Sequence, residues 1–337
     1  MSLYLAVLAA FVVSSGGTWI VREYARRRSV LDVPNERSSH TRPTPRGGGA
    51  AIVAAVLLSV VALWRGNVID TAVTLAALGA GGAVAAIGFV DDHRPVPARV
   101  RLAIHFGAAA WTLYWTGVPP VWNALVGSAV PAAVGYVVTA FALVWLLNLY
   151  NFMDGIDGLA ASEAVFVCAA AAGILLTDGR GAPPLSMLLA AASCGFLLWN
   201  FPPASIFMGD VGSGFVGIIL GVIGLEVGKS SQHAAAFLIL LAIFITDATV
   251  TLFRRWRSGV SVSTAHRTHA YQRLSQRFGS HQSVTLLVAL LNLVWLLPLA
   301  LLVQRGLIDV STGLAAAFVP LAVGTWLLGA GIQPAAS

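Results

Sequence analysis

The sequence contains few charged residues and few cysteines. Only 10% of its 337 residues are Asp, Glu, Lys or Arg, whereas 58% are hydrophobic, and the mean hydropathy is +0.82. Cys168 and Cys194 both fall in apolar segments, so they indicate neither a redox compartment nor a metal site. No separate soluble domain and no low-complexity tail is evident. The composition predicts a polytopic membrane protein that forms one domain over residues 1–337.

The scarcity of charge leaves long apolar segments. A membrane helix needs about 20 apolar residues, and the first segment lacks the basic start of a cleaved signal peptide. Glycines at 217, 221, 224 and 228 have the spacing of close helix packing. We therefore predict an all-α fold with about eleven transmembrane helices, at residues 3–21, 48–64, 71–90, 102–118, 132–150, 158–176, 184–199, 211–228, 234–253, 283–303 and 311–330.

The basic residues are distributed unequally between the two sides of this topology. Seven arginines lie in 22–47, three in 91–101 and six in 254–282, and all these connections fall on one side, together with 148–157 and 200–210. The other side has only Arg65, Arg180, Lys229 and Arg305. Because cytoplasmic loops are rich in Lys and Arg, we predict an external N-terminus and a cytoplasmic C-terminus. The same bias explains the net charge of +6 without a nucleic-acid partner.

Five carboxylates fall on the predicted cytoplasmic side: Asp91, Asp92, Asp154, Asp157 and Asp210. Charges near the membrane are costly, so their convergence indicates a site rather than scattered helix caps. The adjacent Asp91 and Asp92 are hard oxygen ligands that suit Mg²⁺ or Mn²⁺ on a phosphate. Asp210 precedes Gly212 and Gly214 at the start of an apolar helix, whose N-terminus attracts phosphate.

Amide side chains accompany these acids. The run LNLYNFMDGIDGLA carries Asn148 and Asn151, and its glycines are expected to break the helix and form a polar cup at the membrane surface. Asn200 opens the run NFPPASIFMGDVGSG. Within that run, Phe207 is a candidate for stacking on a nucleotide base, although simple packing explains it equally well.

The basic connections contain candidate phosphate-binding residues. His266 and His269 are three residues apart, which favours one helical face, and His beside carboxylates suits a diphosphate. Zinc is less favoured because no Cys accompanies them. Asp247, inside an apolar helix, needs a partner or water, and pairing with an Arg or His would let it support the site. The first connection carries four basic residues that suit either an anionic head group or an interfacial anchor: Arg37, His40, Arg42 and Arg46.

Five sequence blocks resemble a known family. DVPNERSSHTRPTPRGGG, DD at 91–92, NLYNFMDGIDG, NFPPASIFMGDVGSG and the HRTH loop follow the order seen in polyprenyl-phosphate N-acetylhexosamine-1-phosphate transferases, glycosyltransferase family 4. The resemblance spans about residues 30–275. It implies a multi-pass enzyme of the bacterial inner membrane that uses Mg²⁺ or Mn²⁺. Such an enzyme transfers a sugar 1-phosphate from a UDP-N-acetylhexosamine to undecaprenyl phosphate and releases UMP.

The resemblance also implies roles for individual residues. Asp210 would be the principal metal ligand, with Asp91 or Asp92 nearby, and one of this pair would deprotonate the lipid phosphate. His266 or His269 would steady the diphosphate. Direct attack and an aspartyl intermediate both stay open. The nucleotide and its phosphates would be held by Asn148, Asn151, Asp154, Asp157 and Asn200.

Two departures from the family pattern bear on the substrate. The acidic motif reads DDHRP, so Pro95 stands where many members have another acid or amide. The two separated histidines differ from the consecutive histidines of the peptidoglycan-initiating translocase. This difference favours a branch that starts O-antigen, lipopolysaccharide, teichoic acid or another surface polymer in cell-wall biogenesis. UDP-GlcNAc, UDP-GalNAc, UDP-FucNAc and UDP-QuiNAc are the candidate donors.

Two other membrane functions compete with this interpretation. A secondary transporter would place acids near the bilayer midplane and show an internal repeat, and neither feature is present. A membrane prenyltransferase also uses paired acids and Mg²⁺ but does not explain the Asn148 and Asn151 pair. The oligomeric state, including a homodimer, stays open.

Overall fold

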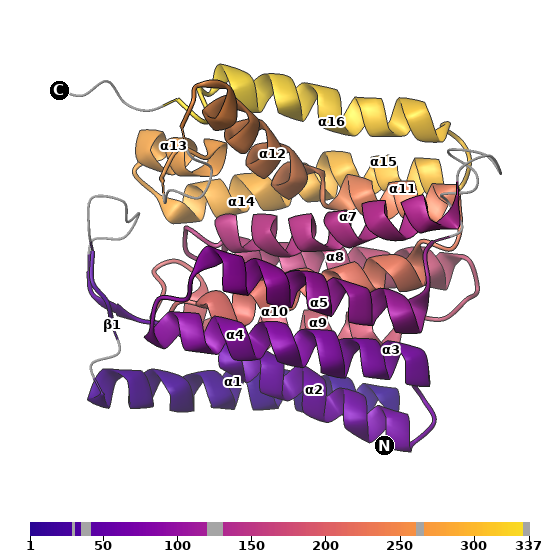
Figure 1. The fold of residues 1–337 in the computed structure, drawn as a ribbon, viewed down its shortest axis with the longest axis horizontal. Coiled ribbons are helices and arrows are strands. Elements are labelled where there is room, and N and C mark those ends of the chain that lie inside the picture. Colours follow the sequence, from indigo (N-terminus) through magenta and orange to yellow (C-terminus); the bar gives the residue numbers. More distant parts are fainter. Residues whose placement is uncertain (29–30, 35–41, 120–130, 261–265, 333–337) are drawn as a thin grey trace.

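The chain folds into a bundle of helices in a computed structural model, which describes residues 1–28, 31–34, 42–119, 131–260 and 266–332 (Figure 1). Each predicted apolar segment coincides with one helix or a consecutive series. These are α1 (Leu3–Arg27), α2 (Gly49–Arg65), α3 (Thr71–Ala76) with η1 (Ala77–Gly81) and α4 (Gly82–His93), α5 (Ala98–Thr116), α7 (Ala132–Phe152), α8 (Leu159–Thr177), α9 (Pro184–Asn200), α10 (Asp210–Val227), α11 (Ser231–Leu240) with α12 (Ala242–Arg257), α14 (His281–Leu291) with η2 (Asn292–Leu296) and α15 (Leu297–Gln304), and α16 (Val310–Leu327).

Two small features lie outside this series. The short helix α13 (Ala270–Phe278) follows the predicted histidine loop. Strands β1 (Leu31–Asp32) and β2 (Thr44–Pro45) pair antiparallel, with Leu31 opposite Pro45. Helices otherwise dominate the described residues, so the predicted all-α class is confirmed.

The structure has fewer candidate membrane spans than predicted apolar segments. Within the part of the chain that the structure describes, seven helices or helix series are long and apolar enough to cross a membrane. An eighth is added if α11 and α12, which meet at a 70° bend, form one span. The α2 and α9 helices are shorter apolar helices. Seven or eight spans thus follow from length and composition, and about eleven stays a prediction.

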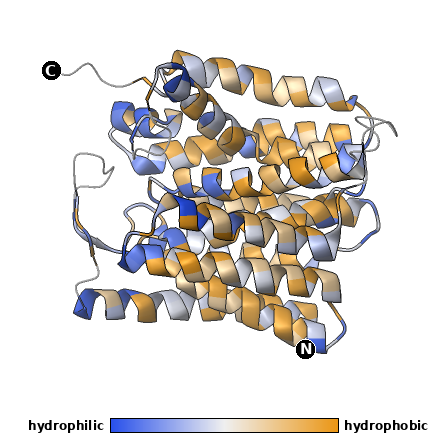
Figure 2. Cartoon of the chain, viewed as in Figure 1, coloured by the Kyte–Doolittle hydropathy of each residue, from blue (hydrophilic) through white to orange (hydrophobic). Residues whose placement is uncertain are grey.

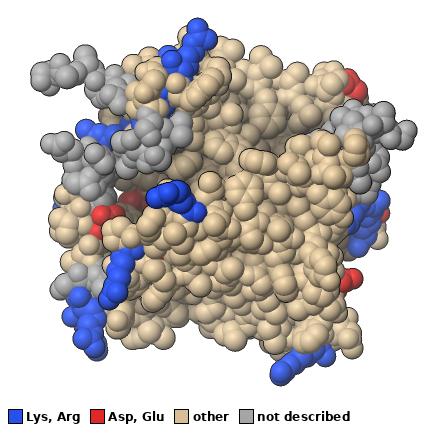
Figure 3. Space-filling view, in the orientation of Figure 1, with Lys and Arg blue, Asp and Glu red and all other residues tan. Residues whose placement is uncertain are grey.

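The polar connections predicted on one side do gather at one end of the bundle. Figure 1 shows β1 and α13 at this end, and Figure 2 shows apolar residues concentrated between two more polar ends. In Figure 3 the charged side chains on the visible face likewise lie at the ends, with a broad uncharged belt between them. Hydrogen bonds join all five connections: Phe207 N to Pro45 O, Asp210 N to Asp92, Ala204 N to Asp157 and Tyr271 OH to Phe152 O. Which end faces the cytoplasm stays a prediction.

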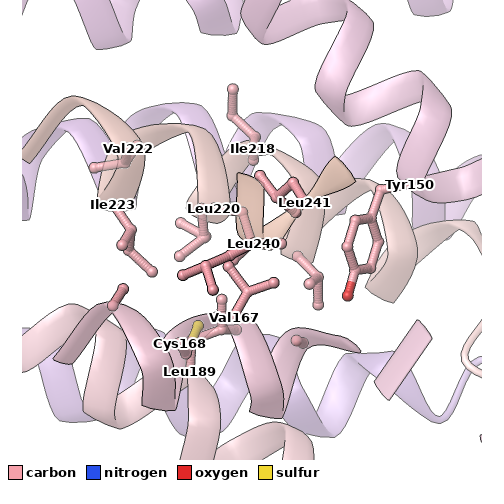
Figure 4. Close-up of a cluster of buried hydrophobic side chains, with 14 of the residues drawn as sticks. Tyr150, Val167, Cys168, Leu189, Ile218, Leu220, Val222, Ile223, Leu240 and Leu241 are labelled. Atoms are coloured by element: carbon pink, nitrogen blue, oxygen red, sulfur yellow. The ribbon is translucent and has the colours of Figure 1, made fainter. Parts of the chain in front are cut away.

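Helix α10 lies at the centre of the bundle, and nearly all of its residues are buried. Figure 4 shows part of this core, in which Ile218 and Leu220 of α10 and Val167 and Cys168 of α8 belong to one cluster of buried side chains. Cys168 is fully buried there. The position of α10 matters for the site because its first residue is Asp210.

Glycines allow α10 to approach its neighbours closely, as their spacing predicted. A Cβ atom added at Gly217 would lie 2.8 Å from the Cα of Leu147 in α7, and one at Gly221 would lie 2.5 Å from Leu143 Cδ2. Real Cβ atoms do not approach other atoms this closely. The glycines therefore set the distance between α10 and α7, the helix that carries Asn148 and Asn151.

We predict that Gly217→Ala destabilises the protein because the added methyl group meets backbone rather than a movable side-chain end. Overpacking of this kind costs about 1–3 kcal/mol. Gly173→Ala in α8 is the matched control, since a Cβ there meets nothing within 4 Å. Thermal unfolding in detergent measures both variants. Equal unfolding temperatures for Gly217→Ala and Gly173→Ala would contradict the close α7–α10 contact.

Candidate active site

A cavity of about 680 Å³ opens at the end of the bundle where the five connections meet. Its polar lining comes from α4, α5, α7, α10 and the α12–α13 region, and it includes Asp91, Arg101, His105, Asn148, Asn151, Asp210, His266, His269, Tyr271 and Gln272. Its apolar lining includes Leu102, Phe106, Phe141, Val144, Trp145, Phe152 and Leu252. Six of the predicted site residues therefore share one cavity: Asp91, Asn148, Asn151, Asp210, His266 and His269.

Asp92 is buried behind this cavity and holds the start of α10. Its carboxylate accepts hydrogen bonds from the backbone N–H groups of Asp210 at 3.0 Å and Val211 at 3.1 Å. A negative charge at a helix N-terminus is favourable because it satisfies free N–H groups and the helix dipole. Arg46 adds a cation, with its Nε 4.0 Å from Asp92 Oδ1 and a hydrogen bond to the Asp92 carbonyl. Asp92 therefore supports the site from outside the cavity lining.

Asp91, the neighbouring residue on α4, faces the cavity. Its Oδ1 accepts a hydrogen bond of 2.6 Å from the Val96 N–H, and its Oδ2 is paired with Arg101 Nη1. The same Nη1 atom lies 3.5 Å from Asp210 Oδ2. One guanidinium thus lies between two carboxylates from helices α4 and α10.

Two amides line the wall formed by α7. The Asn148 side-chain amide donates to the Val144 carbonyl at 2.7 Å and lies 3.3 Å from His105 Nδ1. Ser213 of α10 donates to Asn151 Oδ1 at 2.8 Å. These bonds fix the orientation of both amides, which line the cavity about one turn apart on the same helix.

Asp154 lies in the turn between α7 and α8, near the acids but outside the cavity lining. Burial raises its pKa well above the ordinary value, and the negative charges of Asp210, Asp92 and Asp157 raise it further. The turn therefore lies in a region of negative potential, which a bound cation would offset.

Asp157 and Asn200, two further predicted site residues, bind neighbouring backbone segments outside the cavity. Asp157 Oδ2 accepts from the Ala204 N–H at 3.0 Å, and its Oδ1 lies 3.1 Å from His281 Nδ1. Asn200 is buried, with its Oδ1 accepting from the Gly158 N–H and its Nδ2 donating to the Ile206 carbonyl, both at 3.0 Å. Both side chains tie the glycine turn to neighbouring segments and lie outside the cavity lining.

His266 and His269 enter the cavity from the segment before α13. Their rings stack 5.0 Å apart, and His269 Nδ1 lies 3.2 Å from Asp247 Oδ1. Asp247 also accepts from the N–H groups of Ala270 and Tyr271, both at 2.9 Å. The predicted pairing of Asp247 with an arginine or histidine is therefore confirmed. Burial and the charges of His269 and Arg255 lower the pKa of His266 to about 3, so that its ring is neutral at ordinary pH.

The first connection contributes at the edge of the site. Arg46 contacts Asp92, as described above. Phe207 is bonded through its backbone to Pro45 and Gly48 and does not line the cavity. Arg42 likewise does not line the cavity. Arg37 and His40 lie outside the described residues.

Four polar residues of the cavity lining were not among the predicted site residues: Arg101, His105, Tyr271 and Gln272. Arg101 was counted only among the three arginines of residues 91–101, and Tyr271 lies two residues after the HRTH loop. His105 lies one turn after Arg101 in an apolar helix, and the high cost of a polar group there could have identified it. Tyr271 donates to the Phe152 carbonyl at 2.8 Å, and a Cβ at Gly155 would lie 2.1 Å from its hydroxyl. Gly155 therefore makes room for Tyr271.

The acids suit a metal ion that shares its ligands with a substrate. Among the described residues, no group of three or more His, Cys, Asp or Glu side chains forms a preassembled metal site. Mg²⁺ is usually held by one or two carboxylates together with substrate phosphates. Asp91 and Asp210 fit that pattern, since a cationic guanidinium already lies between them. Asp92 fits less well because both of its carboxylate oxygens accept backbone hydrogen bonds.

The fold and the cavity together define a multi-pass membrane protein with a cavity lined by acids, amides and histidines at one end of its bundle. The family model that matches the chain is Glycosyl transferase family 4, over residues 72–228. The decaprenyl-phosphate N-acetylglucosaminephosphotransferase of Mycolicibacterium smegmatis is 36% identical over 324 residues, which cover 86% of this chain and 79% of that protein. The chain belongs to glycosyl transferase family 4.

Other relatives have similar names. The probable undecaprenyl-phosphate N-acetylglucosaminyl 1-phosphate transferase of Bacillus subtilis is 29% identical, with 86% of this chain and 83% of that protein covered. The undecaprenyl-phosphate alpha-N-acetylglucosaminyl 1-phosphate transferase of Escherichia coli K12 is 25% identical, with coverage of 85% and 81%. None of these three relatives is a transporter or a prenyltransferase.

We predict that Asp154→Asn stabilises the metal-free protein increasingly as the pH rises. Because the folded-state pKa is raised, the unfolded chain loses this proton first, so ionisation reduces stability above about pH 4. Asparagine cannot titrate. The measurement is the difference in unfolding temperature between variant and wild type at pH 4, 6 and 8. A difference that is constant or shrinks with pH would contradict the raised pKa.

Proposed function

We propose that this chain transfers N-acetylhexosamine 1-phosphate from a UDP-sugar to a polyprenyl phosphate. An oxygen of the lipid phosphate attacks the β-phosphorus of the donor and forms a new P–O bond. The bond between this phosphorus and the oxygen bridging to the α-phosphate breaks, and UMP leaves with that oxygen. The products are UMP and a polyprenyl diphosphate-linked sugar.

The observation that carries the proposal is the two-sided lining of the cavity. Acids, amides and an arginine suit the phosphates and the nucleotide. The apolar lining belongs to the same cavity and includes residues at the bundle surface, where Phe141 is 61% and Leu102 is 45% exposed. A water-soluble donor alone would not need this apolar side, whereas a prenyl chain does. The cavity can therefore bring a charged donor and a lipid acceptor together.

Each cavity residue has a role consistent with this reaction. Asp91 is the better placed of the adjacent acids to take a proton from the lipid phosphate, because Asp92 is committed to α10. Asn148 and Asn151 can bind the nucleotide, and His266 and His269 from the segment before α13 can bind the diphosphate. Asp154, Asp157 and Asn200 then act mainly by shaping the turn that borders the site. Phosphoryl transfer depends chiefly on such positioning and on charge neutralisation.

A divalent cation completes the proposed chemistry. Asp210 and Asp91 would hold Mg²⁺ or Mn²⁺, which neutralises phosphate charge when it is bound. Asp210 is the more accessible ligand, with 34% of its side chain exposed compared with 10% for Asp91.

The names of the relatives narrow the choice of sugar donor and of lipid acceptor. All three relatives are named for N-acetylglucosamine and for decaprenyl or undecaprenyl phosphate. UDP-GlcNAc is therefore the favoured donor, ahead of UDP-GalNAc and the 6-deoxy sugars. The names do not specify a polymer, so initiation of O-antigen or another surface polysaccharide at the bacterial inner membrane rests on the sequence resemblance.

We predict that purified protein in detergent releases UMP only when a UDP-N-acetylhexosamine, a polyprenyl phosphate and Mg²⁺ are all present. Asp210→Asn and Asp91→Asn should each lower kcat by at least about a hundredfold, because each removes charge that the transition state needs. A panel of the four candidate donors, tested with decaprenyl and undecaprenyl phosphate, identifies the substrates.

The control is Asp70→Asn. Asp70 caps α3 at the opposite end of its helix series from Asp91, and Asn is an equally good cap. This variant should keep full activity. Absence of UMP release with every donor and both lipids, from protein that unfolds cooperatively, would overturn the proposed function.

A further inference from the structure

Arg101 occupies an unusual position in the cavity. It lies in the first turn of α5, where the helix dipole disfavours a cation. Its Nη1 atom is nevertheless paired with Asp91 and lies 3.5 Å from Asp210 Oδ2. Among the described cavity-lining residues it is the only Arg or Lys side chain. Helix stability does not explain this placement, but attraction to the two carboxylates does.

The guanidinium and a divalent cation would compete for the same oxygen atoms. Asp92 offers no alternative, because its oxygens accept the N–H groups of Asp210 and Val211. Asp91 Oδ1 is likewise engaged by the Val96 N–H. Arg101 Nη1 thus contacts the one Asp91 oxygen that Val96 leaves available, Oδ2, and also Oδ2 of Asp210.

We propose that Arg101 holds the two carboxylates together before a divalent cation binds and exchanges its carboxylate contacts for a substrate phosphate afterwards. This inference rests on the proposed function. When the divalent cation is bound and Arg101 stays in the cavity, the charges of Asp91, Asp210, Arg101 and the metal ion add up to a net positive charge. The diphosphate of the donor or the phosphate of the lipid balances it. Guanidinium suits this exchange because it stays charged and bonds carboxylate and phosphate with the same planar geometry.

The proposed exchange predicts that removing the Arg101 guanidinium changes the affinities for Mn²⁺ and for UDP-GlcNAc in opposite directions. In Arg101→Ala or Arg101→Gln, Mn²⁺ no longer competes with a guanidinium, so its Kd without substrate should fall about tenfold. The same variants lose a charge-assisted phosphate contact, so the Kd for UDP-GlcNAc measured with saturating Mn²⁺ should rise about tenfold. Electron paramagnetic resonance of free Mn²⁺ measures the first affinity, and isothermal calorimetry measures the second. Neither readout requires turnover.

Two further variants separate this role from others. Arg99→Ala removes an exposed arginine of the same helix turn that does not line the cavity, and it should change neither affinity. Arg101→Lys keeps the charge without the planar fork, and it should bind Mn²⁺ with an affinity between those of wild type and Arg101→Ala.

Three results would overturn the proposal. An unchanged Mn²⁺ affinity in Arg101→Ala with weaker UDP-GlcNAc binding would make Arg101 a static phosphate ligand. Unchanged affinities for both would make it a structural anchor, and weaker Mn²⁺ binding would show that it supports the metal ligands. Failure of the proposed function is distinguishable, because wild-type protein would then release no UMP even if the Mn²⁺ result were as predicted.

Discussion

The arrangement of the site depends on the carboxylate of Asp92, which accepts the first two N–H groups of α10. This bond joins α4 to the helix at the centre of the bundle. It also requires glycine at two places. A Cβ at Gly209, which has φ +75°, would lie 2.7 Å from Asp92 Oδ2, and a Cβ at Gly88 would lie 2.4 Å from the Asp210 carbonyl oxygen. Because Asp92 fixes α4 against α10, Asp91 and Asp210 lie beside the same guanidinium.

A second buried carboxylate, that of Asp247, likewise holds a helix N-terminus beside the cavity. Asp247 of α12 accepts the N–H groups of Ala270 and Tyr271 at the start of α13 and pairs with His269. Tyr271 then donates to the Phe152 carbonyl at the end of α7. Two helix N-termini, each held by an aspartate from a neighbouring helix, thus enclose the cavity. Buried carboxylates at these positions are stabilised by charge-assisted bonds rather than by water.

Much of the architecture could be predicted from hydropathy and charge. Each apolar segment formed a helix, and the Arg-rich connections gathered at one end, since apolar residues and polar connections separate in a membrane. The roles of neighbouring polar residues could not be predicted. Asp91 and Asp92 are adjacent, and about 100° of helix rotation turns one to the cavity and the other to α10. Asn200 and Asn148 are chemically identical, and only the packing of distant segments makes the first a structural tie and the second part of the cavity.

The division of roles between Asp91 and Asp92 is the central claim, and comparing Asp91→Asn with Asp92→Asn tests it most directly. Unfolding temperature and UMP release are measured for both. Asp92→Asn places an amide donor against backbone N–H groups and should cost about 1–3 kcal/mol of stability. Asp91→Asn should keep the wild-type unfolding temperature and lose turnover. A stable but inactive Asp92→Asn, together with an unstable Asp91→Asn, would reverse the two roles and contradict the account.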